Sequence, residues 1–112
     1  MPFRAYIRAL DKELALGHAT ERTHYPALKA LLETLAGDAI ASNEPARIEC
    51  GAPDFILTRA GIPLGYGEAK DVGAALTRWE RSDQGKRYLG SLHNLILTNF
   101  LEFRWYVGGE LR

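Results

Sequence analysis

Several residues in the stretch GAPDFILTRAGIPLGYGEAKDVG, residues 51–73, combine side-chain types and a spacing that could do chemistry. If DFILTR and PLGYGEAK pair as an antiparallel hairpin around an Ala-Gly turn, Asp54 and Glu68 fall side by side. Side chains alternate along a strand, so Glu68 and Lys70 share a face, while Ala69 points the other way and offers its backbone carbonyl. Two carboxylates and a carbonyl form the hard-oxygen site that Mg²⁺ prefers, and an ammonium group beside them can orient or activate a water molecule. The stretch therefore predicts a metal site for phosphodiester hydrolysis.

The surrounding sequence predicts the elements that would hold this hairpin in place. Apolar residues at helical spacing predict a first helix that ends at Gly17 and a second that begins at a Thr23 cap and ends at Gly37. SNEPA then indicates a loop, and short segments bounded by Gly and Pro predict strands at RIEC, DFILTR and PLGYGEAK. A third helix runs from Leu76 to Gly90, and strands follow at NLILTN and EFRWYV. The order ααβββαββ predicts an α/β or α+β fold with one central mixed β-sheet flanked by helices.

Length and composition set the class of protein. With 112 residues, of which 46% are hydrophobic and 25% charged, the chain predicts one ordinary globular domain over residues 1–112. The single cysteine, Cys50, excludes an internal disulfide, and no apolar run reaches the roughly 18 residues that a membrane span needs. The N-terminus lacks a signal-peptide pattern, so we expect a reducing, cytoplasmic setting without a membrane partner. The net charge of +0 gives no overall pointer to a partner.

The hairpin residues also carry a resemblance to a known family. Pro53 and Asp54, separated by 13 residues from the EAK of residues 68–70, resemble the PD-(D/E)xK nuclease superfamily, whose restriction-endonuclease-like core has the order αβββαβ. The sequence QGKRY, from Gln84 to Tyr88, resembles the Q-x-x-x-Y helix motif of one large branch of that superfamily. A spacing of four puts both side chains on one helix face. The resemblance implies an endodeoxyribonuclease that uses Mg²⁺ or Mn²⁺ and acts on DNA.

Longer stretches narrow the resemblance. GHATERTHYPALKALLETLA, NEPARIECGAPDFIL, GYGEAKDVG and NLILTNFLEFRWYVGGE together resemble the N-terminal nuclease domain of large single-polypeptide restriction–modification enzymes. This resemblance implies that Glu21, in the helical segment before the sheet, completes the acidic site. It also implies that methyltransferase and target-recognition modules follow the nuclease domain, so that these residues correspond to a fragment of a longer enzyme.

These considerations assign a role to each candidate residue. Asp54, Glu68 and the Ala69 carbonyl are expected to hold the metal, and Lys70 to position the attacking water and offset charge in the transition state. The resemblance implies that Gln84 orients Lys70 or the water from the neighbouring helix. We expect DNA contacts from the helix that carries QGKRY, at Arg78, Arg81, Lys86, Arg87 and Tyr88.

Each assignment has a plainer alternative. The metal-site residues could instead be a strand cap after Pro53 and an exposed ion pair on an edge strand. Gln84 and Tyr88 could be a polar helix face and a core aromatic, Glu21 a first-turn acid near Thr20, and the basic cluster a solvated face. For the whole domain, the alternatives are a catalytically silent nuclease-fold module with a binding or structural role, and a stand-alone junction-resolving nuclease. The DNA target, the cleavage polarity and the oligomeric state, a homodimer included, stay open.

Overall fold

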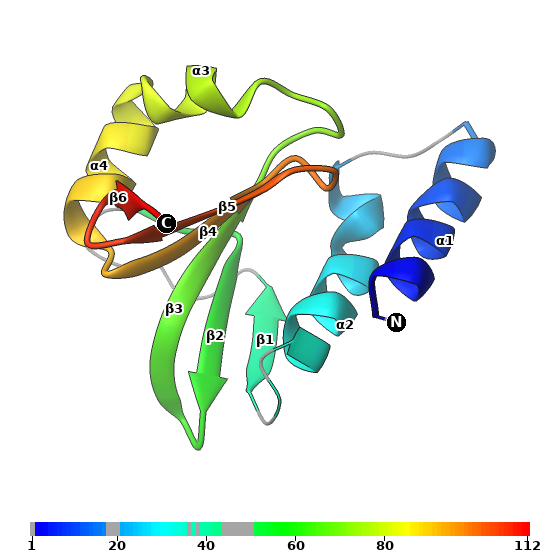
Figure 1. Cartoon of the computed structure of the whole chain (residues 1–112), viewed down its shortest axis with the longest axis horizontal. Coiled ribbons are helices and arrows are strands. Elements are labelled where there is room, and N and C mark those ends of the chain that lie inside the picture. The colour runs from blue at the N-terminus through cyan, green and yellow to red at the C-terminus, as the bar shows by residue number, and fades with distance from the viewer. Residues whose placement is uncertain (1, 18–20, 36, 38, 44–50) are drawn as a thin grey trace.

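A six-stranded mixed sheet with helices on both faces forms the domain (Figure 1). The computed structural model describes residues 2–17, 21–35, 37, 39–43 and 51–112. The helical elements are α1 (Pro2–Ala15), η1 (Glu21–His24), α2 (Tyr25–Leu35), α3 (Leu76–Glu80) and α4 (Asp83–Ser91). The strands are β1 (Ile40–Asn43), β2 (Phe55–Arg59), β3 (Ile62–Ala69), β4 (Asn94–Thr98), β5 (Phe103–Val107) and β6 (Glu110–Leu111). None of the described helices is long and apolar enough to cross a membrane.

The strands follow one another in the sheet in the same order as in the chain, β1-β2-β3-β4-β5-β6. All neighbouring pairs are antiparallel except β3 and β4, which are parallel. Parallel neighbours need a long crossover, and α3 with α4 supplies it. The predicted central mixed sheet is therefore confirmed, with β3 and β4 as its innermost strands.

Two apolar clusters cover the two faces of the sheet. The first joins α1 and α2 to β1, β2 and β3, and the second joins α3 and α4 to β4 and β5. Leu95 and Leu97 belong to the second cluster, whereas Ile96 packs against the first, as alternation along β4 requires. Tyr66 packs against the second cluster, so Glu68, two residues further along β3, lies on the face covered by α3 and α4.

The first two predicted helices are confirmed, with one difference at the start of the second. Tyr6 and Leu10 lie on the buried side of α1, which packs against α2. The Tyr6 hydroxyl donates a hydrogen bond to the carbonyl of Phe100 at 2.7 Å. The 3₁₀ turn η1 leads directly into α2, so Thr23 lies inside a helical turn rather than at the predicted cap position. The N-terminal layer is thus a two-helix unit tied to the loop between β4 and β5.

The predicted third helix is wrong as a single element, because the chain breaks it into α3 and α4. Trp79 and Tyr88 are nine residues apart and would lie on opposite sides of one continuous helix. The break at residues 81–82 lets both rings enter the same cluster, with centroids 5.8 Å apart. Ser82 begins α4 by accepting a hydrogen bond from the Gly85 N–H at 3.0 Å, as a helix cap does.

The predicted hairpin is confirmed, whereas the strand before it differs. Ala60 and Gly61 both have positive φ, 52° and 79°, which is the conformation of a two-residue hairpin turn. Ser42 and Asn43, predicted as loop, end strand β1, which pairs with β2. The predicted strand RIEC, residues 47–50, lies outside the described residues. The turn at residues 60–61 and a register shift between Leu57 and Thr58 together set how the charged residues of the hairpin meet.

Candidate metal and active site

Asp54, Glu68 and Lys70 come together where β2 begins and β3 ends, and we call them the hairpin site. Strand pairing places Phe55 opposite Gly67, so the next pair outward is Asp54 and Glu68. The backbone N–H of Asp54 donates to Glu68 Oε1 at 3.3 Å. Lys70 Nζ lies 3.0 Å from Glu68 Oε2. The structure therefore confirms that the two carboxylates and the ammonium group lie close together, as predicted.

The backbone of β3 turns two different edges toward this site and toward β4. The Ala69 N–H donates to Asp54 Oδ2 at 2.8 Å, on the β2 side. The next N–H, that of Lys70, donates to the Thr98 carbonyl at 2.8 Å, on the β4 side. Because the N–H and C=O of one strand residue point to the same edge, the Ala69 carbonyl also faces the Asp54 side. This is the position that a metal ligand from Ala69 requires.

Glu68 is a buried carboxylate, and burial of its negative charge costs free energy. Its exposed fraction is 4%, against 28% for the Lys70 side chain, and it sits in β3, an internal strand. The alternative prediction, that Glu68 and Lys70 form an exposed ion pair on an edge strand, is therefore excluded. Burial and the nearby negative charge of Asp54 raise the pKa of Glu68 to about 7, while Lys70 opposes this rise. Near neutral pH, Glu68 consequently exchanges between its charged and neutral forms.

The donor set of the hairpin site fits a hard divalent cation. It offers two carboxylates, each with lone pairs beyond the hydrogen bonds described above, and one backbone carbonyl. A cation between the carboxylates would offset the repulsion by Asp54, which after burial is the second cause that raises the pKa of Glu68. Within residues 2–17, 21–35, 37, 39–43 and 51–112, no group of three or more His, Cys, Asp and Glu side chains converges. The predicted third acid, Glu21, begins η1, and its side chain lies outside the described part of the structure.

The two residues of the predicted helix motif lie in α4 and serve the second cluster. Gln84 Oε1 accepts a hydrogen bond from the Trp79 indole N–H at 2.7 Å, so this amide ties α4 to α3. Its predicted role beside Lys70 stays a prediction. Tyr88 is 1% exposed, and its ring packs so closely on Gly51 that a Cβ there would lie 2.9 Å from it. The Tyr88 side chain therefore fills the core in place of the predicted DNA contact.

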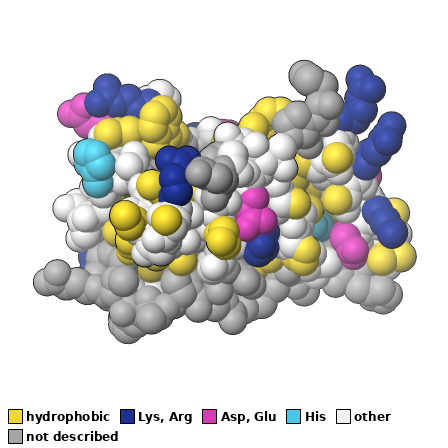
Figure 2. Space-filling view, turned by 90° about the horizontal axis from the view of Figure 1, so that it is seen from below, with side chains coloured by type: hydrophobic (Ala, Val, Ile, Leu, Met, Phe, Trp, Pro, Cys, Tyr) yellow, Lys and Arg dark blue, Asp and Glu magenta, His cyan; other side chains and the backbone are white. Residues whose placement is uncertain are grey.

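Two groups of exposed basic residues lie on helical segments of the described structure. The predicted cluster on α3 and α4 is exposed at Arg78, Arg81, Lys86 and Arg87. A second group, which the sequence interpretation missed, lies on α1 at spacing four, and comprises Arg4, Arg8 and Lys12. Figure 2 shows basic side chains projecting from the side of the molecule where α1 lies. The signal for this group was present in the sequence, because residues four apart share a helix face.

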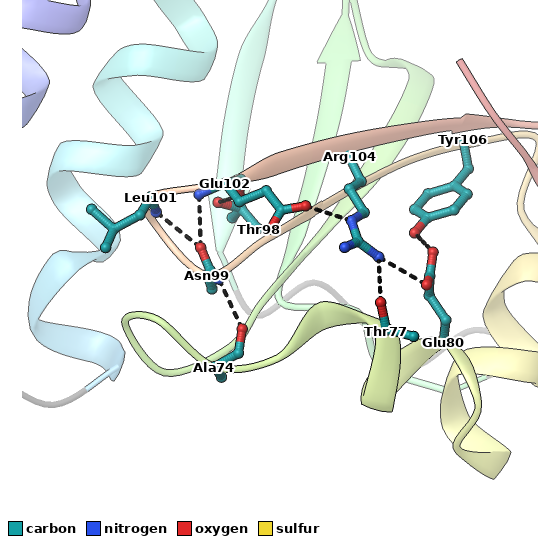
Figure 3. Close-up of polar contacts among 9 residues, drawn as sticks. All are labelled: Ala74, Thr77, Glu80, Thr98, Asn99, Leu101, Glu102, Arg104 and Tyr106. Atoms are coloured by element: carbon teal, nitrogen blue, oxygen red, sulfur yellow. Dashed lines mark hydrogen bonds and ion pairs between the residues drawn. The ribbon is translucent and has the colours of Figure 1, made fainter.

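The sequence interpretation also missed a polar cluster around Arg104, which we call the Arg104 network (Figure 3). The Arg104 guanidinium donates to Glu80 Oε1 at 2.8 Å, to Glu102 Oε2 at 2.7 Å and to Thr77 Oγ1 at 3.2 Å. The Tyr106 hydroxyl donates to the other oxygen of Glu80. These contacts tie α3 to β5 across 24 to 27 residues of sequence. Their long range explains why local patterns gave no sign of them.

Comparisons with known proteins find a solved structure of similar fold, but they do not assign the chain to a family. No family model matches this chain, and no curated protein matches it either. Among solved structures, a chain of the DrdV–DNA complex, determined by cryo-EM, superposes with a TM-score of 0.81 at 20% sequence identity. The superposition covers 98% of this chain and 12% of that chain. The likeness confirms the predicted fold class, a restriction-endonuclease-like open mixed sheet flanked by helices, and this chain corresponds to a small part of the larger protein.

Proposed function

We propose that this chain is a metal-dependent endodeoxyribonuclease domain that hydrolyses phosphodiester bonds of DNA. The observation that carries the proposal is the hairpin site, where Asp54 and Glu68 lie side by side with Lys70 Nζ 3.0 Å from Glu68. Burial, and after it the nearby charge of Asp54, raise the pKa of Glu68, which costs stability, and such arrangements cluster at functional sites. The same three residues are those that resemble the PD-(D/E)xK motif.

In this proposal each residue of the hairpin site has a distinct task. Asp54, Glu68 and the Ala69 carbonyl hold Mg²⁺ or Mn²⁺, and the bound cation supplies a Lewis acid for the phosphate and lowers the pKa of water. Lys70 orients the attacking water and stabilises negative charge that develops on the phosphate oxygens. Glu68 holds the Lys70 ammonium group within the hairpin site through their 3.0 Å contact. Glu21 and Gln84 act as outer partners of this site.

The proposed biological setting is a restriction–modification enzyme. The support is the resemblance of several stretches to the nuclease domain of such enzymes, and a fold shared with a chain that was solved in complex with DNA. That chain is much longer than this one, which covers 12% of it. We therefore propose that methyltransferase and target-recognition modules supply sequence-specific reading, while this domain supplies cleavage and contacts phosphates through the exposed basic residues of α3 and α4.

The test is conversion of supercoiled plasmid to nicked and linear forms. The protein is incubated with plasmid and Mg²⁺, with EDTA as the metal control, and compared with Asp54→Ala and Glu68→Gln. The matched control is Glu102→Gln, which removes a carboxylate from the Arg104 network but not from the hairpin site. We expect cleavage by the wild type and by Glu102→Gln only. A folded wild type that binds plasmid without cutting it would favour the silent-module alternative.

A further inference from the structure

The segment that follows Lys70 is a tight turn held by one buried side chain. β3 ends at Ala69, and the N–H of Ala74 donates to the Asp71 carbonyl at 2.9 Å to close the turn. Gly73, at φ 77°, supplies the left-handed conformation that the third position of such a turn needs. The Gly73 N–H then donates to the backbone carbonyl of Asn99 at 3.2 Å. The turn is thus hydrogen-bonded to the residue that follows β4.

Asn99 uses its whole amide to make this connection (Figure 3). Its Nδ2 donates to the Ala74 carbonyl at 2.8 Å. Its Oδ1 accepts from the backbone N–H of Leu101 at 3.1 Å and of Glu102 at 2.7 Å. The residue is 6% exposed, so these bonds are made away from solvent, where an unmade bond is costly. One side chain therefore shapes the β4–β5 loop and fastens the turn after Lys70 to it.

Lys70 is fixed on one side by the sheet and on the other side by this turn. Its N–H donates to the Thr98 carbonyl, the last ladder bond before the chain leaves β3. Beyond that point the direction of the chain depends on the Gly73 and Ala74 bonds to Asn99. A lysine side chain has four rotatable bonds, so its ammonium group reaches Glu68 reproducibly only if its backbone is held.

We propose that Asn99 is a positioning residue for Lys70: its amide fastens the turn of residues 71–74 to the end of β4 and so aims the Lys70 ammonium group at Glu68. The catalytic meaning of this role rests on the proposed nuclease function. Asn99 itself touches none of the residues of the hairpin site by its side chain; it acts through the backbone on either side of Lys70. A misplacement of about 1 Å is enough to lower a rate by a large factor.

Two substitutions break this connection in different ways. Asn99→Ser is too short to reach the Ala74 carbonyl but can still accept a hydrogen bond from a nearby backbone N–H. Asn99→Asp keeps an acceptor for both N–H groups of the loop and replaces the donor to Ala74 by a carboxylate oxygen, which repels the Ala74 carbonyl, so it tests the connection if the serine variant does not fold. The matched control is Asn94→Ser at the start of β4, the strand that Asn99 follows; the Asn94 Nδ2 donates to the Leu64 carbonyl of β3 at the end away from Lys70.

The first readout needs no enzymatic activity. Carbon-13 relaxation of the side-chain ε-carbon is measured for Lys70, with the exposed Lys86 as an internal reference of a mobile lysine. We expect Lys70 to be restrained in the wild type and in Asn94→Ser, and to approach the mobility of Lys86 in the Asn99 variants. If Lys70 stays as restrained as in the wild type in a folded Asn99 variant, the positioning role is overturned, whatever the nuclease assay shows.

The second readout is a double-mutant cycle on plasmid cleavage at saturating DNA. We expect Asn99→Ser to lower the cleavage rate about 10- to 100-fold and to have no further effect in a Lys70→Ala background, because both changes remove the same aimed ammonium group. Independent, additive losses would overturn the role of Asn99 through Lys70. An inactive wild type would refute the nuclease proposal alone, and the relaxation measurement would still decide the role of Asn99.

Discussion

Two clusters in this domain contain the same number of charged groups of each sign but arrange them differently. Each holds two carboxylates and one cation: Asp54, Glu68 and Lys70 in the hairpin site, and Glu80, Glu102 and Arg104 in the Arg104 network. In the Arg104 network the guanidinium stands between the two carboxylates and donates to both. In the hairpin site the carboxylates stand next to each other, and the ammonium group reaches Glu68 from one side.

The difference separates a structural ion-pair network from a site that needs another ligand. In the Arg104 network the cation is paired with both carboxylates, and its hydrogen bond to Glu102 is the largest cause that raises the pKa of Arg104. Burial, and after it the hydrogen bond to Glu80, raise the pKa of Tyr106 to about 12. The hairpin site leaves its more buried carboxylate, Glu68, with a pKa raised to about 7. A network whose cation pairs with both of its carboxylates holds elements together, whereas one that leaves two carboxylates adjacent is suited to bind a further cation. The predictions below test this distinction.

The largest expected effect is on cleavage in Lys70→Ala. The ammonium group acts on the water and the transition state, so we expect the cleavage rate to fall by about 100-fold or more, while Mg²⁺ binding persists. Plasmid nicking and a Mg²⁺ titration of the same protein measure the two properties. Arg104→Met is the comparison variant, and its remaining folded protein should cut at close to the wild-type rate. Near wild-type cleavage by Lys70→Ala would remove Lys70 from the mechanism.

The second prediction concerns the pH dependence of stability in the absence of metal. A carboxyl group whose pKa rises from 4.5 to about 7 on folding stabilises the fold fully below pH 4.5, and this contribution is lost as the pH rises to about 7. A shift of that size corresponds to at most about 3 kcal/mol in the free energy of unfolding. We expect Glu68→Gln to lack this decline and to be more stable than the wild type at pH 8.

Urea unfolding between pH 5 and 8 with EDTA present measures this effect, and Glu102→Gln should keep the wild-type decline. The same decline in Glu68→Gln would place the titrating group elsewhere.

The third prediction concerns the Arg104 network, where we expect a loss of stability rather than of chemistry. Arg104→Met leaves Glu80 and Glu102 without their shared donor, and hydrogen bonds to charged groups contribute about 1.5–3 kcal/mol each when buried. Because the Arg104 side chain is 21% exposed, we expect a smaller loss of about 1–2 kcal/mol in the free energy of unfolding. Denaturant titration at pH 7 tests this. A variant as stable as the wild type would show that α3 is held without Arg104.

The smallest expected effect comes from the exposed basic residues, which neither cluster engages. Replacing Arg78 and Arg81 by Gln should weaken binding to any DNA sequence by a similar factor and should reduce the slope of log affinity against log salt by about 1–2. Fluorescence anisotropy with a random-sequence duplex at several salt concentrations measures the slope. The same double change at Arg4 and Arg8 on α1 tests the second basic group. An unchanged slope in both variants would direct the search for the DNA-facing surface elsewhere.

The sequence predicted the hairpin site well because its geometry is local. The positive-φ pair Ala60 and Gly61 fixes a two-residue turn, which brings the start of β2 close to the end of β3, and the period of two along β3 puts Lys70 on the same face as Glu68. The hairpin also contains one irregularity that the sequence did not predict. The register shifts by one residue between Leu57 and Thr58: a regular ladder from the turn would set Asp54 against Gly67, and the shift sets it against Glu68.

The features that could not be predicted depend on contacts between distant segments. The break between α3 and α4 had a local sign in the opposite phases of Trp79 and Tyr88, but its reason is that both rings pack in one cluster. Asn99 and Arg104 bind partners about 25 residues away, and a hydrogen bond across that distance follows from the assembled sheet. No period in the sequence encodes such contacts.

The most direct test of the central claim is the effect of Mg²⁺ on the thermal midpoint at pH 8. A ligand that binds only the folded state raises the midpoint by an amount that grows with the logarithm of 1 + [L]/Kd, and at this pH Glu68 is mostly charged. The hairpin site as a metal site predicts a concentration-dependent rise for the wild type and for Glu102→Gln, and none for Asp54→Ala. An equal rise in Asp54→Ala would contradict the account, because the metal would then bind at a place other than the hairpin site.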